Sequence, residues 1–244
     1  MIESAASTVS AGRGEVPRPG AVIAIDGPAG SGKSTAARRV AIALGLRYLD
    51  TGAMYRALTW WLQEQRVDLA DTAAVLGRIA EPRIEVGTDP RQSRIAVDGL
   101  EVAGPIRTRR VSNSVSTVAA IPQVRAQLIA RQRDIIAAAA ASGAGIVAEG
   151  RDIGTVVAPD AAVKVYLTAR DDVRARRRST ELGDDPAATV ADIQREQARR
   201  DKRDAGQLVA AADAIEIDTS ALSLDEVVGQ VVAMARSRRV VSRG

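Results

Sequence analysis

The residues most suited to chemistry lie between positions 27 and 34, where the sequence reads Gly-Pro-Ala-Gly-Ser-Gly-Lys-Ser. This spacing is typical of a phosphate-binding loop, and it follows an apolar run at 21–25. The glycines let the backbone curl so that several amides point at one anion, and a helix beginning near Lys33 adds the positive end of its dipole. We expect Lys33 to reach the β- and γ-phosphates of a nucleotide and Ser34 to bind Mg²⁺.

A glycine-rich turn that binds no ligand is the alternative interpretation of this segment. Its position between an expected strand and an expected helix favours the phosphate loop, because the motif requires that context. Lysine usage favours it too. Only three of the 34 basic residues are lysines, at positions 33, 164 and 202. A chain that otherwise uses arginine has lysine in the loop, where a compact ammonium suits a phosphate cradle better than a planar guanidinium.

A second polar cluster follows the next expected strand, where residues 49–56 read Leu-Asp-Thr-Gly-Ala-Met-Tyr-Arg. Ligands of open α/β sheets bind at the carboxyl ends of the strands, so this segment should lie at the same edge as the loop. Thr51 can cap the following helix, contact a ligand, or do both. Arg56 can meet a phosphate, and its alternative is an ordinary surface arginine.

A third cluster ends the apolar run at 146–148 with Glu149, Gly150, Arg151 and Asp152. Glu149 is similar to the acidic end of the strand that organises Mg²⁺ through water in many nucleotide-binding proteins. An ordinary salt-bridged turn is the alternative.

Arginines are concentrated in two runs, at 170–178 and 195–203. On a helix, Arg174 and Arg178 share one face. A solvated basic face is the usual explanation of such a run, but beside a phosphate loop it can be a lid that neutralises a transferring phosphoryl group. Nucleic acid is a third possible partner. It is disfavoured because aromatic residues, which stack on bases, make up only 2% of the chain.

The composition limits the chemistry of the whole 244-residue chain. It contains no cysteine and no histidine, so its reactions must use carboxylates, hydroxyls, Arg, Lys and bound Mg²⁺. Apolar residues make up 46%, and the absence of Phe means that the core is built from Ala, Val, Ile and Leu. No apolar run is long enough to span a membrane. Residues 1–20, rich in Ser, Ala, Gly and Pro, are interpreted as a disordered tail, and a cytoplasmic location is expected.

Five short apolar runs that alternate with helical stretches predict an α/β fold with a parallel sheet. The expected strands are 22–26, 46–49, 145–149, 163–167 and 214–218. The expected helices are 33–44, 52–65, 123–141, 170–182, 187–203 and 223–238.

The stretch 83–103 breaks this alternation. Residues 83–86 and 94–97 alternate with period two, and Asp98-Gly99 before 100–102 is a strong hairpin signal. A small antiparallel insert is therefore predicted between the second and third main strands in chain order. A decorated surface loop is the alternative.

Taken together and in this order, the motifs closely resemble those of the bacterial cytidylate kinases, a family of P-loop nucleoside monophosphate kinases. The resemblance rests on the phosphate loop, on 50–56, on the Asp98-Gly99 insert, on Glu-Gly-Arg-Asp-Ile-Gly-Thr at 149–155 and on the arginine-rich helix. It runs from about Val22 to about Arg238. The segment 150–155 and the insert make it specific, because P-loop kinases at large do not share them.

The resemblance implies an adenylate-kinase-like fold, with a five-stranded parallel sheet flanked by helices, a nucleoside-monophosphate-binding insert and an arginine-bearing lid. The domain would span 21–239, with its core at 21–65 and 123–239, the insert at about 66–122 and the lid at about 174–204. The implied reaction is phosphoryl transfer from Mg-ATP to CMP or dCMP by a monomer. Another small-molecule kinase, for UMP, AMP or a metabolite such as shikimate, is the alternative.

The resemblance also implies roles for individual residues. Lys33, Arg151 and Arg178 would be catalytic, and Ser34 would bind the metal. The residues that would contact ATP are Gly27, Pro28, Ala29, Gly30, Ser31, Gly32, Lys33, Ser34 and Thr35. The residues that would contact the acceptor nucleotide are Thr51, Tyr55, Arg56, Ser116, Arg125, Arg151, Asp152, Arg200 and Asp204. Among these, Ser116, Arg125 and Asp152 would face the cytosine, and Arg200 and Asp204 the ribose.

Asp152 has a physical reason to select cytosine. Cytosine presents an amino donor where uracil presents a carbonyl oxygen, and a misplaced acceptor opposite a carboxylate should cost about 2–4 kcal/mol. The chain departs from the family after Asp204, where a stretch that usually carries a further phosphate-binding arginine is shortened to Ala-Gly-Gln-Leu. Arg199 or Arg203 is a candidate to replace that arginine.

Two other classes of protein fit the residues less well. A GTPase reads guanine with Asn/Thr-Lys-x-Asp, but Val163 precedes Lys164 and Asp201 precedes Lys202, so the motif is missing. An RNA-binding module would need stacking aromatics.

Overall fold

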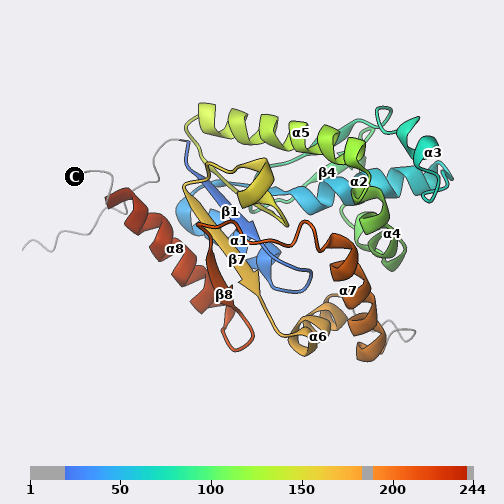
Figure 1. Cartoon of the computed structure of the whole chain (residues 1–244). Coiled ribbons are helices and arrows are strands. Elements are labelled where there is room, and N and C mark those ends of the chain that lie inside the picture. Colours follow the sequence, from blue (N-terminus) through green and yellow to red (C-terminus); the bar gives the residue numbers. More distant parts are fainter. Residues whose placement is uncertain (1–19, 183–188, 241–244) are drawn as a thin grey trace, which may run out of the picture.

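A five-stranded parallel sheet forms the centre of the molecule, in the order β2-β6-β1-β7-β8 (Figure 1). The computed structural model describes residues 20–182 and 189–240. The strands are β1 (Val22–Asp26), β2 (Arg47–Asp50), β6 (Ile146–Gly150), β7 (Val163–Thr168) and β8 (Ile215–Asp218). All five predicted strands are confirmed, with boundaries that move by one residue at most. The predicted tail at 1–20 lies outside the described residues, apart from Gly20.

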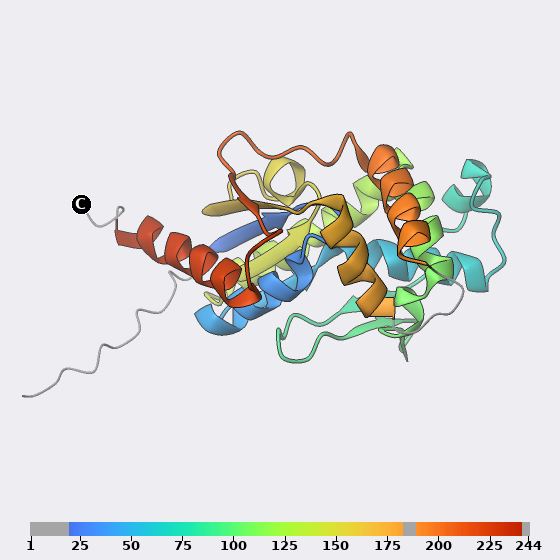
Figure 2. The ribbon, with the colours of Figure 1, turned by 90° about the horizontal axis from the view of Figure 1, so that it is seen from below.

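Helices cover both faces of the sheet (Figures 1 and 2). One apolar cluster joins β1 and β7 to α1 (Lys33–Leu44) and α8 (Leu224–Val240). The other lies under α2 (Thr51–Glu64) and α5 (Pro122–Ala141). Because β1 and β6 are buried on both faces, their sequences are continuous apolar runs, not alternating ones.

The predicted insert is a three-stranded antiparallel sheet of β3 (Ile84–Val86), β4 (Ile95–Val97) and β5 (Leu100–Glu101). Asp98 and Gly99, with φ of 52° and 82°, form the tight turn between β4 and β5. The Asp98 carboxylate accepts hydrogen bonds from the Trp61 indole at 3.0 Å and from the Arg83 amide at 2.8 Å. The bond from Trp61 attaches the hairpin to α2, and the bond from Arg83 holds it to the start of β3, so the alternative of a decorated loop is wrong.

Four short elements were not predicted: α3 (Thr72–Leu76), η1 (Pro105–Arg107), α4 (Arg109–Ala119) and the π-helical turn η2 (Ile153–Val157). The sequence of α4 is rich in Ser, Asn and Val, which are poor helix formers. Val111, Val115 and Val118 lie at helical spacing, are buried, and hold α4 against α2 and η1. Tertiary packing therefore creates a helix that propensity does not indicate.

The arginine-rich segments form α6 (Asp171–Leu182) and α7 (Val190–Asp204), which pack against each other (Figure 2). Thr189 and Asp192 form a capping box at the start of α7, and positions 187 and 188 of the predicted helix lie outside the described residues. α4 contacts α7, so the insert and the predicted lid meet. In the part of the chain that the structure describes, no helix is long and apolar enough to cross a membrane.

Candidate functional site

The predicted phosphate loop follows β1 at the carboxyl edge of the sheet. Gly27, Gly30 and Gly32 have φ of 150°, 79° and 86°, a region that favours glycine. A Cβ on Gly27 would lie 2.2 Å from the carbonyl oxygen of Leu167. Gly32 precedes α1 and provides no side-chain cap, so the first amides of the helix remain available for an anion.

Lys33 lies at the start of α1, and its Nζ donates to the carbonyl oxygen of Pro28 at 3.1 Å. Burial lowers the pKa of Lys33, while the neighbouring Glu149 carboxylate opposes that shift. The positive charges of Arg151 and Arg200 also lower this pKa. The ammonium of the half-buried Lys33 therefore lies in a strongly charged environment where an added phosphate would interact with it.

Glu149 forms an oxygen-rich cluster beside Ser34. The carboxylate is 1% exposed and accepts hydrogen bonds from Ser34 Oγ at 2.9 Å and from the Tyr48 hydroxyl at 2.7 Å. Burial, followed by the nearby Asp50, raises the pKa of Glu149 to about 7. Glu149 itself has hydroxyl partners, whereas Arg151 and Asp152 form ion pairs with Asp204 and Arg125, so the alternative of a salt-bridged turn describes part of this segment. Hydroxyl and carboxylate oxygens are the ligands that Mg²⁺ prefers.

Asp50 and Thr51 make different contacts at the start of α2. The Asp50 side chain caps the helix by accepting from the Ala53 amide at 2.9 Å. Thr51 Oγ1 instead donates to the main-chain oxygen of Glu149 at 2.7 Å. The capping role considered for Thr51 is therefore wrong, and its hydroxyl joins β6 to α2.

Four guanidinium groups gather beside the phosphate loop, and we call them the arginine cluster: Arg56, Arg151, Arg178 and Arg200. Burial, followed by the charges of Arg200 and Arg178, lowers the pKa of Arg56 to about 9. Burial and the charges of Arg151 and Arg178 lower the pKa of Arg200 to about 10. Arginines that depress each other's pKa in a buried space form a site that an anion would stabilise.

Two members of the arginine cluster, Arg151 and Arg200, each keep a buried donor without a partner among the described residues. Arg151 pairs with Asp204 at 2.9 Å, but its buried Nη1 has no hydrogen-bond partner there, nor has the buried Nε of Arg200. Arg56 and Arg178 donate to the same hydroxyl, Ser112 Oγ, at 2.8 and 3.0 Å. Ser112 was missed by the sequence reasoning, because it carries no motif and α4 was not predicted.

An ion pair joins two of the residues that were predicted to face the cytosine. Arg125 on α5 forms a buried ion pair with Asp152, which follows β6. Tyr55 lies close to both, since their charges act on its hydroxyl, and burial raises the pKa of Tyr55 to about 12. Ser116 is buried on α4, one turn after Ser112. The fold therefore gathers residues of β6, α2, α4 and α5 around the predicted acceptor.

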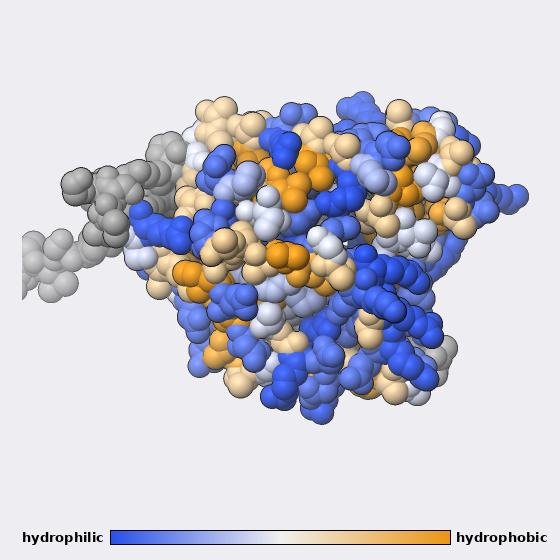
Figure 3. All heavy atoms as spheres, viewed as in Figure 1, coloured by the Kyte–Doolittle hydropathy of each residue, from blue (hydrophilic) through white to orange (hydrophobic). Residues whose placement is uncertain are grey.

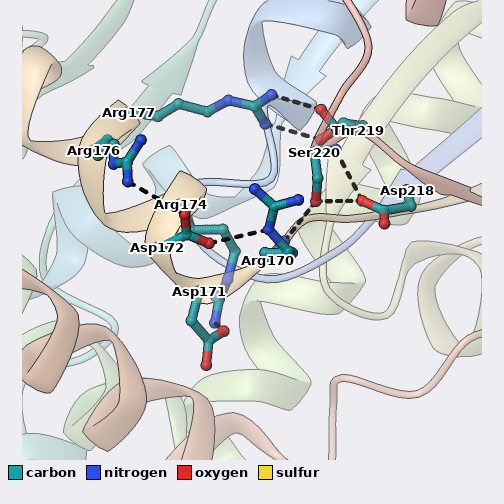
Figure 4. Close-up of polar contacts among 9 residues, drawn as sticks. All are labelled: Arg170, Asp171, Asp172, Arg174, Arg176, Arg177, Asp218, Thr219 and Ser220. Carbon is teal, nitrogen blue, oxygen red and sulfur yellow. Dashed lines mark hydrogen bonds and ion pairs between the residues drawn. The ribbon is translucent and has the colours of Figure 1, made fainter.

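The arginines of the run at 170–178 differ in their surroundings. Arg170 and Arg176 pair with Asp172 on the surface (Figure 4). Arg174 donates to the carbonyl oxygen of Ala29 in the phosphate loop at 3.0 Å and pairs with Asp201 on α7 at 2.7 Å. The solvated face therefore describes Arg170 and Arg176, and the charge-neutralising lid stays a prediction.

Arg177 binds the phosphate loop from the other side. It donates to the side-chain and main-chain oxygens of Thr219 at 2.9 and 2.7 Å, as Figure 4 shows. Thr219 Oγ1 lies 3.0 Å from the carbonyl oxygen of Ser31, to which it donates. Arg174 and Arg177 thus hold the outer carbonyls of the loop, and Arg178 is the member of the run that lies in the arginine cluster.

The two arginines considered as replacements for the missing phosphate-binding arginine do not enter the site. Arg199 and Arg203 are exposed on α7, whose outer surface is hydrophilic (Figure 3). Two other residues of α7 are buried instead. Arg200 belongs to the arginine cluster, and Asp204 pairs with Arg151. The positive charge of the site therefore comes from Arg200 and its three neighbours.

The fold and this site define a P-loop phosphotransferase: a parallel α/β sheet, a phosphate loop, a buried carboxylate beside the loop serine, and an arginine cluster. The chain belongs to the cytidylate kinase family, whose model matches residues 23–237. It is 47% identical to the cytidylate kinase of Streptomyces griseus, over 93% of this chain and 98% of that one. It is 49% identical to the cytidylate kinase of Streptomyces coelicolor, over 91% and 95%. A gluconokinase structure from Sinorhizobium meliloti 1021 aligns at 15% identity with a TM-score of 0.44, over 92% and 97%.

Proposed function

We propose that the protein transfers the γ-phosphoryl group of ATP to CMP and dCMP, giving ADP and CDP or dCDP. The observation that carries this proposal is the arginine cluster next to Lys33, which supplies a second anion site within reach of the phosphate loop. Membership of the cytidylate kinase family supports the choice of acceptor. The transfer is in-line and has no covalent intermediate, so the protein acts by positioning and by charge neutralisation.

The donor site consists of the phosphate loop together with Arg151 and Arg178. Amides of the loop from Gly27 to Thr35 bind the ATP phosphates, and Lys33 lies along the β- and γ-phosphates. Arg151 and Arg178 neutralise the charge that spreads over the transferring group. A divalent ion fits beside Ser34, whose hydroxyl already bonds to the Glu149 carboxylate, and Mg²⁺ bound there would neutralise phosphate charge.

The acceptor site occupies the space between α2, α4, α5 and the end of β6. Arg56 and Arg200 bind the acceptor phosphate and ribose with Thr51 and Asp204, and Tyr55 lies beside the base. Asp152, held by Arg125, accepts from the cytosine amino group and disfavours uracil, with Ser116 on the neighbouring helix. Because Arg200 is buried and the other three arginines are half-buried, bound phosphate would be partly shielded from water, which strengthens each contact.

Ser112 should contribute to acceptor binding through the two arginines it joins. In a Ser112→Ala variant, Arg56 and Arg178 lose their shared acceptor, so we expect the KM for CMP to rise about 5-fold, the equivalent of roughly 1 kcal/mol. Steady-state kinetics with CMP as the varied substrate measures this. Ser114→Ala is the matched control, because the Ser114 hydroxyl bonds only within α4, to Arg110. Equal KM values in the two variants would contradict the role of Ser112.

The proposed reaction is tested by measuring ADP production from Mg-ATP with CMP, dCMP, UMP, AMP and shikimate offered separately. Strong turnover with CMP and dCMP alone is expected. Preferential turnover of another acceptor would retain the kinase fold and overturn the base recognition proposed for Asp152. ATP binding without turnover of any acceptor would indicate that the shortened segment after Asp204 has removed half of the acceptor site.

The remaining expectations concern partners and location. A monomeric state, the lack of nucleic-acid binding and a cytoplasmic location stay predictions. Light scattering of the purified protein measures the first, and retention on RNA in moderate salt measures the second.

A further inference from the structure

Asp26, the last residue of β1, makes two hydrogen bonds that none of the proposed steps uses. Its carboxylate, 6% exposed, accepts from the amides of Ile153 and Gly154, each at 2.8 Å. These amides open the π-helical turn η2, where the main chain provides them with no acceptor. In β-sheet register, Asp26 lies between Gly150 of β6 and Tyr166 of β7. A central, rigid strand therefore holds the start of η2.

The residue that would ordinarily cap η2 is Asp152, which occupies the N-cap position. An Asp at this position usually accepts a hydrogen bond from the first turn with its own side chain. Here the Asp152 side chain makes no capping bond, and its carboxylate pairs with Arg125 instead. Only the main-chain oxygen of Asp152 serves the turn, accepting from Val156 at 2.8 Å.

The close approach of Asp26 to the turn depends on Gly154. A Cβ at this position would lie 3.4 Å from Asp26 Oδ2 and 3.2 Å from the Lys164 side chain. Lys164, although packed against Gly154, directs its Nζ to Asp213 at 2.9 Å. The geometry therefore reserves the Asp26 carboxylate for the two backbone amides.

We infer that Asp26 is a positioning residue for base recognition: it caps η2 in place of Asp152 and so leaves the Asp152 carboxylate to face Arg125 and the acceptor base. Without Asp26, the amides of Ile153 and Gly154 compete for the carboxylate of Asp152, the N-cap residue, and draw it away from Arg125. Gly27 of the phosphate loop directly follows Asp26. Asp26 therefore joins the phosphate loop to the segment that carries Asp152. This inference rests on the proposed function.

The test compares wild type with Asp26→Asn by the ratio of kcat/KM for CMP to kcat/KM for UMP. An asparagine of the same shape can accept from one amide but turns its NH₂ towards the other. We expect the ratio to fall about 10-fold and the KM for CMP to rise, while the KM for ATP changes less. Asp26→Ser introduces a smaller side chain and no clash, and it should lower the same ratio of kcat/KM values. It replaces the asparagine variant in the test if that variant folds poorly.

Asp71→Asn is the matched control, since Asp71 also accepts from two helix N-terminal amides, those of Ala73 and Ala74, in the remote helix α3. In Asp71→Asn, the ratio of kcat/KM for CMP to kcat/KM for UMP should stay within about 2-fold of wild type. A double-mutant cycle with Asp152→Asn separates positioning from general damage, because an effect that acts through Asp152 disappears once Asp152 is gone. An unchanged ratio in Asp26→Asn, or full additivity in the cycle, would overturn the inference.

The two proposals fail in different ways. If wild type does not phosphorylate CMP, the proposed function is wrong. If wild type prefers CMP and the Asp26 variants keep the same preference, only the inference about Asp26 is wrong.

The ionisation of Asp26 gives a second readout that needs no substrate. Burial raises its pKa to about 6. The charges of Asp152 and Lys33 and the Tyr166 hydroxyl interact with it, while the ammonium of the neighbouring Lys164 pairs with Asp213. A raised pKa means that the folded protein gains stability as the pH falls through about 6 towards the unfolded value. We expect the Tm of wild type, relative to Asp26→Asn, to rise by on the order of 5 °C between pH 7.5 and pH 4.5. A pH-independent Tm difference would contradict a buried, ionised Asp26.

Discussion

A Lys33→Met variant is expected to retain its fold and to lower kcat with Mg-ATP and CMP by at least about 10²- to 10³-fold. Methionine keeps the approximate length of the side chain and its apolar stem but removes the charge of Lys33, on which the charges of Glu149, Arg151 and Arg200 act. The loss falls mainly on turnover, because the ammonium matters most when negative charge shifts between the β- and γ-phosphates.

Rapid-quench measurement of ADP formation tests this, with calorimetric titration of ATP to separate binding from chemistry. Lys202→Met is the matched control, because Lys202 is an exposed lysine of α7. It should retain wild-type kcat. Wild-type turnover in Lys33→Met would show that the phosphoryl transfer proposed here does not depend on the loop lysine, and the mechanism would have to be abandoned.

Asp152→Asn should reduce the preference for CMP over UMP more than any other single change at the acceptor site. In the proposed function the carboxylate would accept from the cytosine amino group and repel the uracil carbonyl, a difference of about 2–4 kcal/mol or about 30- to 700-fold in kcat/KM. An asparagine can turn either its oxygen or its NH₂ to the base, so it accommodates both. It also leaves Arg125 without its charged partner.

Competition between CMP and UMP for limiting Mg-ATP measures this ratio directly. Asp160→Asn, at an exposed position eight residues further along the chain, is the control for removing one carboxylate from this region. A preserved CMP preference in Asp152→Asn would assign base recognition to other residues, and it would remove the basis for the role of Asp26.

The phosphate loop and the parallel sheet could be predicted because their local requirements are visible in the sequence. Left-handed backbone at Gly27, Gly30 and Gly32 favours glycine, and strands buried on both faces read as short apolar runs. The turn at Asp98-Gly99 was equally visible, since few other pairs of residues adopt its dihedral angles.

The arrangement of the arginines could not be predicted in the same way. Position on a helix face gives the direction of a side chain, but the partners of Arg174 and Arg177 are main-chain oxygens of Ala29 and Thr219, far away in the sequence. Ser112 was missed for a related reason. It lies on α4, a helix formed by packing and not by propensity, so no local signal marked it.

Because the arginine cluster brings four positive charges together, the lifetime of the protein should depend on the supply of its substrates. Mutual repulsion among these side chains opposes folding, and a bound nucleotide phosphate removes that opposition. A ligand that binds only the folded state stabilises it by an amount that grows with its concentration. Proteases cleave the unfolded chain far faster than the folded one, so nucleotides should slow degradation. The residues that bind the acceptor would then also let nucleotide concentration set how long each molecule survives.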